Sequence, residues 1–128
     1  MFELTINDTV YQFKFGLGFV REIEKKHQLK DEDGNIHDAG LQFAVAALID
    51  EDPIELVNIL DIANKTEKPR VTRNLLDAYI EDESTDLDGL CKELLDFFEH
   101  SNATKKKTEA VQELVERERA KQAATAES

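Results

Sequence analysis

The sequence predicts a mainly α-helical α+β protein, in which an N-terminal β-hairpin packs on about five helices and a solvated helical tail follows. Two observations lead to this prediction. Apolar and polar residues alternate with period two near the N-terminus, and apolar residues recur with helical spacing through most of the remaining chain. A length of 128 residues favours a single compact domain. We place that domain at residues 1–102, followed by a charged, partly helical or flexible tail at residues 103–128.

The N-terminal hairpin is predicted from two alternating segments, residues 2–6 and 10–15. Aromatic side chains share one face of the second segment: Tyr11, Phe13 and Phe15. Between the segments, Asn7 and Asp8 tolerate the positive φ angles that tight hairpin turns require. An isolated hairpin is only marginally stable in water, so its apolar face is expected to lie on the helices that follow.

The first helix is expected after Gly16 and Gly18, which interrupt the strand pattern. Its apolar stripe consists of Phe19, Val20, Ile23 and His27. Lys25 and Lys26 mark its end, because cations are favourable near a helix C-terminus. Residues 28–37 are polar and include an Asp-Gly pair, so we expect an exposed loop there.

Four further helices fit the compact part of the chain. Residues 41–49 are almost all apolar, which predicts the most buried helix. The next helix, ending near Ala63, has a strong start signal, with Asp52 at the N-cap, Pro53 first and Glu55 third. The last two are predicted from apolar stripes: Val71, Leu75, Leu76, Tyr79 and Ile80 in one, and Leu87, Leu90, Cys91, Leu94, Leu95 and Phe98 in the other.

The C-terminal segment has a helix-forming composition at residues 105–121 but only a weak apolar stripe. This stripe consists of Ala110, Val111, Leu114 and Val115. Two alternatives follow: the stripe contacts a partner or a neighbouring copy, or it docks on its own domain. Residues 122–128 are small and polar, and we expect them to fray.

Acidic residues dominate the middle of the chain. The whole sequence has 28 acidic and 16 basic residues, a net charge of −12, and residues 31–102 alone have 19 acidic and 5 basic residues, a charge of −14. This balance argues against binding to nucleic acid or to a membrane surface. The sequence shows no signal peptide and no apolar stretch of membrane-spanning length, so a cytoplasmic location is expected.

We find no signature of an enzyme, a cofactor or a metal site. The glycine pair at 16 and 18 lacks the third glycine of a dinucleotide-binding loop. Acidic turns around Gly34 and Gly89 lack the glutamate that closes a calcium loop. The three histidines do not have zinc-ligand spacing. Cys91, the only cysteine, lies on an apolar stripe and is expected to be a buried small apolar residue.

Four segments stand out by their order and spacing: residues 2–16, 40–46, 69–80 and 101–106. Together they resemble the tail assembly chaperones of long-tailed (siphovirus-type) bacteriophages of Gram-positive bacteria. The likeness spans roughly residues 2–115, which is most of the chain.

The resemblance implies a non-enzymatic morphogenesis factor of the host cytoplasm that is absent from the mature virion. Such a chaperone binds the tape measure protein, keeps it soluble and helps recruit tail tube (major tail) subunits. On this interpretation the central negative charge solubilises the complex, and Ala110, Val111, Leu114 and Val115 are the candidate partner-binding residues.

The resemblance also implies self-association and a longer form of the chain made by programmed ribosomal frameshifting. The run Lys105-Lys106-Lys107 is where a slippery site would be encoded, because lysine codons can supply a run of adenines. The alternative interpretation of the same run is a basic, solvated start to a helix.

A second class of function remains open at this stage. A small acidic phage protein can inhibit a host nucleic-acid-binding protein by imitating phosphate charge. Its mimic surface would be Asp82, Glu83, Asp86 and Asp88. Binding by such a mimic would depend steeply on salt, whereas binding to a tape measure protein would have a larger apolar contribution.

Overall fold

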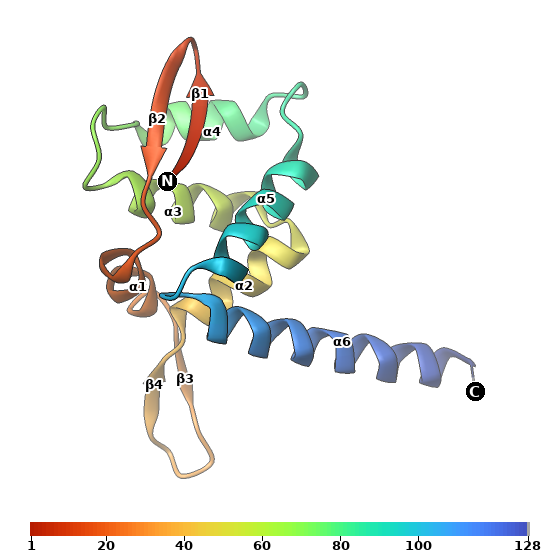
Figure 1. The fold of residues 1–128 in the computed structure, drawn as a ribbon. Helices are drawn as coiled ribbons and strands as arrows, with labels where there is room; N and C mark the ends of the chain where they lie inside the picture. Colours follow the sequence, from red (N-terminus) through yellow and green to blue (C-terminus); the bar gives the residue numbers. More distant parts are fainter. Residues whose placement is uncertain (128) are drawn as a thin grey trace.

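The computed structural model describes residues 1–127, which form six helices and two small antiparallel sheets (Figure 1). The strands are β1 (Phe2–Ile6), β2 (Thr9–Phe13), β3 (Gln28–Lys30) and β4 (Ile36–Asp38). The helices are α1 (Leu17–Glu24), α2 (Gly40–Asp50), α3 (Pro53–Asn64), α4 (Arg73–Glu81), α5 (Leu87–His100) and α6 (Lys105–Glu127). The predicted class, mainly helical α+β, is confirmed.

The N-terminal hairpin forms as predicted. Strands β1 and β2 pair with Phe2 opposite Phe13, and the turn residues Asn7 and Asp8 have φ angles of 51° and 65°. At the end of β2, Phe13 is fully buried, and the amide of Lys14 donates to the carbonyl oxygen of Ala63 in α3 at 2.8 Å. The hairpin is therefore held to the helical body at the end opposite its turn.

Phenylalanine rings join this hairpin to α1 and α5. The ring of Phe15, just after β2, lies 4.9 Å from that of Phe19 in α1 and 5.2 Å from that of Phe98 in α5, both edge-on. Phe2 in β1 makes edge-on contacts with Phe13, Phe15 and Phe97. Edge-on aromatic pairs add to the stabilisation from burial itself, so a hairpin that is marginal alone becomes part of the core.

Helix α2 lies at the centre of the helical body, as the almost continuous apolar run predicts. Its buried residues include Leu41, Val45 and Leu48. A side chain at Gly40 would place its Cβ 1.5 Å from the carbonyl oxygen of Ile23, so only glycine permits this approach of α1 to α2. The carboxylate of Glu24 then accepts from the amide of Leu41 at 2.8 Å and satisfies an otherwise unpaired donor at the start of α2.

The start of α3 confirms its sequence signal, and two other helices begin in the same way. The side chain of Asp52 accepts from the amides of Ile54 at 3.0 Å and Glu55 at 3.3 Å. Thr72 caps α4, and Asp86 caps α5. Each cap satisfies amides that have no partner within their own helix.

The expectation of a loop at residues 28–37 is wrong. Strands β3 and β4 form a second hairpin there, with Leu29 opposite His37. The Asp31 carboxylate builds its turn by accepting from the amides of Asp33 at 3.0 Å and Asn35 at 2.8 Å. Each strand has only three residues, and all six are exposed. The segment therefore lacks the sustained alternation of apolar and polar residues by which a half-buried strand is recognised in a sequence. His27, expected on the first helix, lies between α1 and this hairpin.

Helix α6 is longer than the sequence analysis expects, because it continues through residues 122–127, and Ser128 of the predicted frayed end lies outside the described residues. Its first turns pack on α2 and α5, whereas the following part projects away from the body (Figure 1). No helix within the described residues is both long and apolar enough to cross a membrane.

Candidate functional site

The first turns of α6 are anchored to the body of the protein. Val111 is buried, and so are the polar residues Thr104 and Thr108. The hydroxyl of Thr104 donates to the carbonyl oxygen of Phe98 in α5 at 2.7 Å, and that of Thr108 donates to the carbonyl oxygen of Thr104 at 2.9 Å. These bonds let one face of α6 pack against apolar residues without leaving either hydroxyl unpaired.

The four candidate partner-binding residues divide between two faces of α6. Val111 is buried, and Val115 is half-buried against the core. Ala110 is exposed, and Leu114 is 54% exposed. Val111 and Val115 thus dock on the protein's own domain, whereas Ala110 and Leu114 remain accessible. Contact of these residues with a partner remains a prediction.

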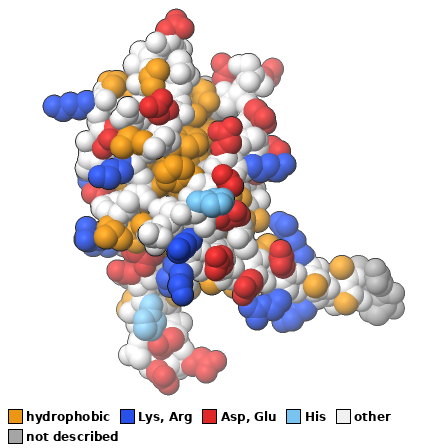
Figure 2. All heavy atoms as spheres, viewed as in Figure 1, with side chains coloured by type: hydrophobic (Ala, Val, Ile, Leu, Met, Phe, Trp, Pro, Cys, Tyr) orange, Lys and Arg blue, Asp and Glu red, His pale blue; other side chains and the backbone are white. Residues whose placement is uncertain are grey.

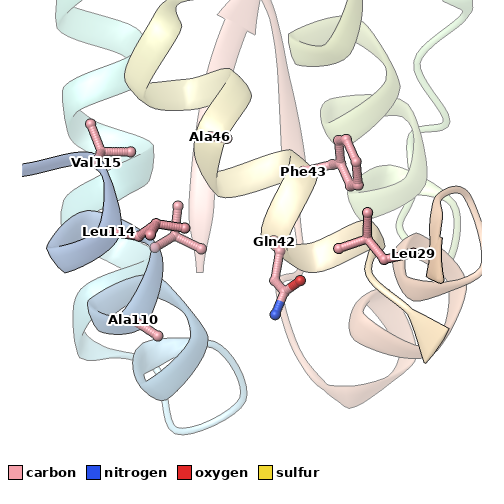
Figure 3. A pocket seen from close by; sticks show the side chains of 8 residues that line it. Leu29, Gln42, Phe43, Ala46, Ala110, Leu114 and Val115 are labelled. Atoms are coloured by element: carbon pink, nitrogen blue, oxygen red, sulfur yellow. The ribbon is translucent and has the colours of Figure 1, made fainter. Parts of the chain in front are cut away.

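An apolar groove of about 330 Å³ lies where α6 meets α2 and the second hairpin (Figure 3). Its lining residues come from three elements: Leu29 from β3, Gln42, Phe43 and Ala46 from α2, and Ala110, Val111, Leu114 and Val115 from α6. Gln42 is the one polar side chain in this lining. All four candidate residues therefore contribute to one groove, together with residues that the sequence analysis missed.

The groove exposes large side chains that lie far apart in the sequence. Leu29 is 48% exposed and Phe43 is 39% exposed. The imidazole of His27 stacks on the ring of Phe43 with 4.5 Å between centroids, and its Nε2 lies 3.7 Å from an oxygen of Glu55. Single exposed apolar side chains are common, but here Leu29, Phe43 and Leu114 line one groove together.

Two signals in the sequence point to the missed residues. Helix α2 is apolar nearly all round, although a helix packed on one face of a domain needs apolar residues only on that face. Phe43 is one of the apolar residues of α2 beyond those that a single packed face requires. Leu29 and Ile36 are the two large apolar residues of the polar segment 28–37, where no predicted core explains them.

The acidic turns use their carboxylates within the chain. Asp31 is hydrogen-bonded by the imidazole of His37, with 2.7 Å between Oδ2 and Nε2, and this bond together with the turn amides lowers the pKa of Asp31. Asp82 accepts from the amide and hydroxyl of Ser84 at 2.9 and 2.7 Å, which likewise lowers the pKa of Asp82.

Two of the three remaining phosphate-mimic candidates have comparable local roles. The side chain of Asp86 accepts from the amide of Gly89 at 3.0 Å and caps α5, and Asp88 forms an ion pair with Lys92 at 2.9 Å. Helix caps and turn bonds explain acidic residues at Asp82 and Asp86, and the i, i+4 pair explains Asp88, without a basic partner protein. All four candidates are exposed, Glu83 included, so charge mimicry at this surface stays a prediction.

Cys91 is buried, as its place on the apolar stripe predicts. Burial raises the pKa of its thiol to about 11, and the nearby Glu51 and Asp88 add to this effect. Because the thiolate is the reactive form of cysteine, Cys91 is chemically inert in the folded protein.

One group within the described residues brings potential metal ligands within 4.8 Å of one another: Asp96, Glu99 and His100. All three are engaged by the protein itself, since an Asp96 carboxylate oxygen lies 3.6 Å from Nδ1 of His100. Nδ1 of His100 lies 2.7 Å from the carbonyl oxygen of Asp96, and the Glu99 carboxylate accepts from Gln112 at 2.7 Å. The second bond links α5 to α6, which is a structural role.

Comparison with known proteins identifies the family. Residues 3–113 match the family model described as "Phage tail assembly chaperone protein, TAC", whereas no curated protein and no solved structure matches the chain. The match takes in both hairpins, α1 to α5 and the anchored first turns of α6. It covers far more than half of the 128 residues. The chain therefore belongs to the phage tail assembly chaperone family, a non-enzymatic class.

Proposed function

We propose that this protein binds the tape measure protein of a long-tailed (siphovirus-type) phage of Gram-positive bacteria and keeps it soluble in the host cytoplasm. It also helps recruit tail tube subunits and is absent from the mature virion. The observation that supports this proposal is the apolar groove between α2, α6 and Leu29 on a strongly charged chain.

The groove and the charge have complementary roles in this proposal. Apolar segments of the client are covered by Leu29, Phe43 and Leu114, which are themselves partly exposed in the free protein. The net charge of −12 then makes coated clients repel one another instead of aggregating.

Co-expression with the tape measure protein tests the proposal. The natural chaperone is expected to move the tape measure protein into the soluble fraction, and Leu114→Asp is expected to abolish most of this effect because it places a charge in the groove. Ile54→Asp is the matched control, since Ile54 is 74% exposed and lies outside the groove lining. Rescue by Leu114→Asp equal to that by Ile54→Asp would contradict the proposed site.

Recruitment of the tail tube is tested separately from solubilisation. Tagged tape measure protein is expected to capture the major tail protein only when the chaperone is present. The Leu114→Asp variant is expected to lose this capture, whereas Ile54→Asp retains it. Capture of equal strength without any chaperone would contradict a recruiting role.

We also propose a longer, frameshifted form of the chain, with its slippery site at the lysine codons that encode the start of α6. Lys105, Lys106 and Lys107 are exposed at a helix N-terminus, where the helix dipole disfavours cations. The run also forms the basic, solvated helix start of the alternative interpretation, so the slippery site is proposed from the lysine codons and not from the helix. Mass spectrometry is expected to detect an extended product that disappears when the lysine codons are changed synonymously. Persistence of that product after recoding would exclude slippage at these codons.

Self-association is the remaining part of the proposal. Light scattering of the purified chain is expected to give a mass above the monomer's 14.6 kDa, rising with concentration. A monomer at every concentration would contradict it while leaving client binding open.

A further inference from the structure

We infer that the groove binds an amphipathic helix whose apolar stripe is flanked by acidic residues on one side and by basic residues on the other. This inference rests on the proposed function and specifies the client segment. It follows from the opposite charges of the two walls of the groove, which are α6 and the tip of the second hairpin.

The α6 wall is basic. Ala110 and Leu114 line the groove, and the same stripe of the helix includes Lys107, Arg117 and Lys121 at spacings of three and four residues. All five side chains are exposed. Figure 2 shows basic side chains along the lower edge of α6, with acidic side chains on the same helix. Lys121 forms an ion pair with Glu118, one turn after Leu114, with 3.6 Å between Nζ and Oε1. Lys107 and Arg117 are therefore the cations that border the two apolar residues most directly.

The hairpin wall is acidic. Leu29 lines the groove, and its cross-strand partner His37 lies on the same face of the hairpin. Asp31 reaches this face as well, because its carboxylate is hydrogen-bonded to His37. Glu32 and Asp33 follow at the exposed tip, where acidic side chains gather in Figure 2. Leu29 therefore connects the apolar groove to an anionic surface.

A helix is the conformation that can contact the apolar groove, the α6 wall and the hairpin wall at the same time. Side chains at i, i+3, i+4 and i+7 form one apolar stripe, and the positions beside that stripe face outward on two different flanks. An acidic flank can then lie along the α6 wall while a basic flank lies along the hairpin wall. Because the two walls differ in sign, the charges also select one of the two directions in which a helix can lie.

A second copy of this chain does not supply such a helix from its compact part. The apolar stripes of α1 to α5 are occupied in the core, through residues such as Ile23, Val45, Leu60, Leu76 and Leu94, which are all at most 1% exposed. The free face of α6 also carries Glu113 and Glu118, but Lys107 and Arg117 border the groove, so the α6 of a second copy would bring like charges to the α6 wall. The occupant is therefore a segment of the client.

Designed peptides of about 18 residues, or five helical turns, test the inference on the full-length protein. Three fluorescent peptides share one leucine stripe, and their flanks are glutamate and lysine, glutamate only, or lysine only. At low salt the mixed-flank peptide is expected to bind about three- to tenfold more tightly than either other peptide, with a difference that shrinks as salt is added. Equal affinity of all three, within about twofold, overturns the charge inference but leaves the apolar groove in place.

Two double variants of α6 provide a matched comparison. Lys107→Glu with Lys121→Glu reverses the wall that borders the groove, and Lys105→Glu with Arg119→Glu makes the same change of net charge on the opposite face. The first variant is expected to shift the preference to the lysine-only peptide, whereas the second retains the preference for mixed flanks. The inference is overturned if both variants behave alike.

The direction of binding gives an independent readout. A nitroxide at the peptide N-terminus is expected to broaden amide signals at one end of the groove for the mixed-flank peptide and at the other end when its two flanks are exchanged. Broadening at the same end for both peptides overturns the inference. If no peptide binds and the tape measure protein is not solubilised either, the proposed function itself fails, which distinguishes that outcome from the charge inference alone.

Discussion

The two hairpins of this chaperone share a local structure but differ in almost everything that holds them in place. The β1–β2 hairpin is built into the core through Phe2 and Phe13, whereas all six strand residues of the β3–β4 hairpin are exposed. They extend in opposite directions from the helical body (Figure 1). The first hairpin therefore contributes to the stability of the core, whereas Leu29 of the second hairpin is accessible to a partner.

The largest effect is expected at the buried end of the first hairpin. Phe13→Ala removes a fully buried ring and is expected to cost about 3–5 kcal/mol of the free energy of unfolding. Urea denaturation measures this change. Val10→Ala is the control on the same strand, since Val10 is 46% exposed and its truncation is expected to cost less than about 0.5 kcal/mol. Equal losses at the two positions would show that the hairpin is not part of the core.

A comparable loss is expected when the bond network between the first hairpin and α3 is broken. The buried side chain of Asn64 donates to the carbonyl oxygens of Gln12 at 2.9 Å and Pro69 at 3.2 Å and accepts from the amide of Val71 at 2.7 Å. Asn64→Ala leaves these buried groups without partners and is expected to cost about 2–4 kcal/mol in urea denaturation. Asn58→Ala on the same helix is the control, and a similar loss there would contradict a special role for Asn64.

Cys91 reports which variants open the core. Because the thiol is buried and its pKa is raised to about 11, a thiol reagent is expected to label it only through large-scale opening. Phe13→Ala is expected to accelerate labelling about a hundredfold or more, in line with its loss of stability. Asp31→Ala is expected to leave the labelling rate unchanged. Faster labelling of the Asp31 variant would mean that the second hairpin supports the core.

The second hairpin is expected to respond locally to the loss of its turn. Asp31→Ala removes the acceptor for the amides of Asp33 and Asn35, so amide exchange at residues 28–38 is expected to accelerate while the urea midpoint stays constant. Binding of the mixed-flank peptide is expected to weaken, because Leu29 and the acidic wall lose their fixed position. Unchanged exchange would show that strand pairing alone maintains the hairpin.

The smallest expected effect is a pH dependence of the stability of the same turn. Hydrogen bonds from His37 and the turn amides hold the pKa of Asp31 below its usual value. The turn is therefore stabilised above the ordinary carboxyl pKa and loses this contribution as the pH falls through the lowered pKa of the folded protein. NMR titration of the Asn35 amide is expected to show a transition below that of an unstructured aspartate. A transition at the ordinary value would contradict the bonded turn.

The sequence was most informative where local chemistry and burial agree. Asp52 and Pro53 mark the start of α3, and the alternation around Phe13 marks β2, because in both places the local pattern matches the final environment. The second hairpin escaped prediction because Leu29 and Ile36 are exposed and leave no periodic pattern. The weak stripe of α6 pointed to four candidate residues but not to which of them stay exposed.

The sequence alone determined the mainly helical class, the first hairpin, the inert Cys91 and the unequal distribution of charge. Only the tertiary structure decided that Val111 is buried while Leu114 is exposed, and that Phe43 and Leu29 join Leu114 in one groove. The physical reason is that periodicity records which face of an element is apolar, whereas exposure depends on what packs against that face. A groove arises from residues far apart in the chain, and their proximity is a property of the packed helices.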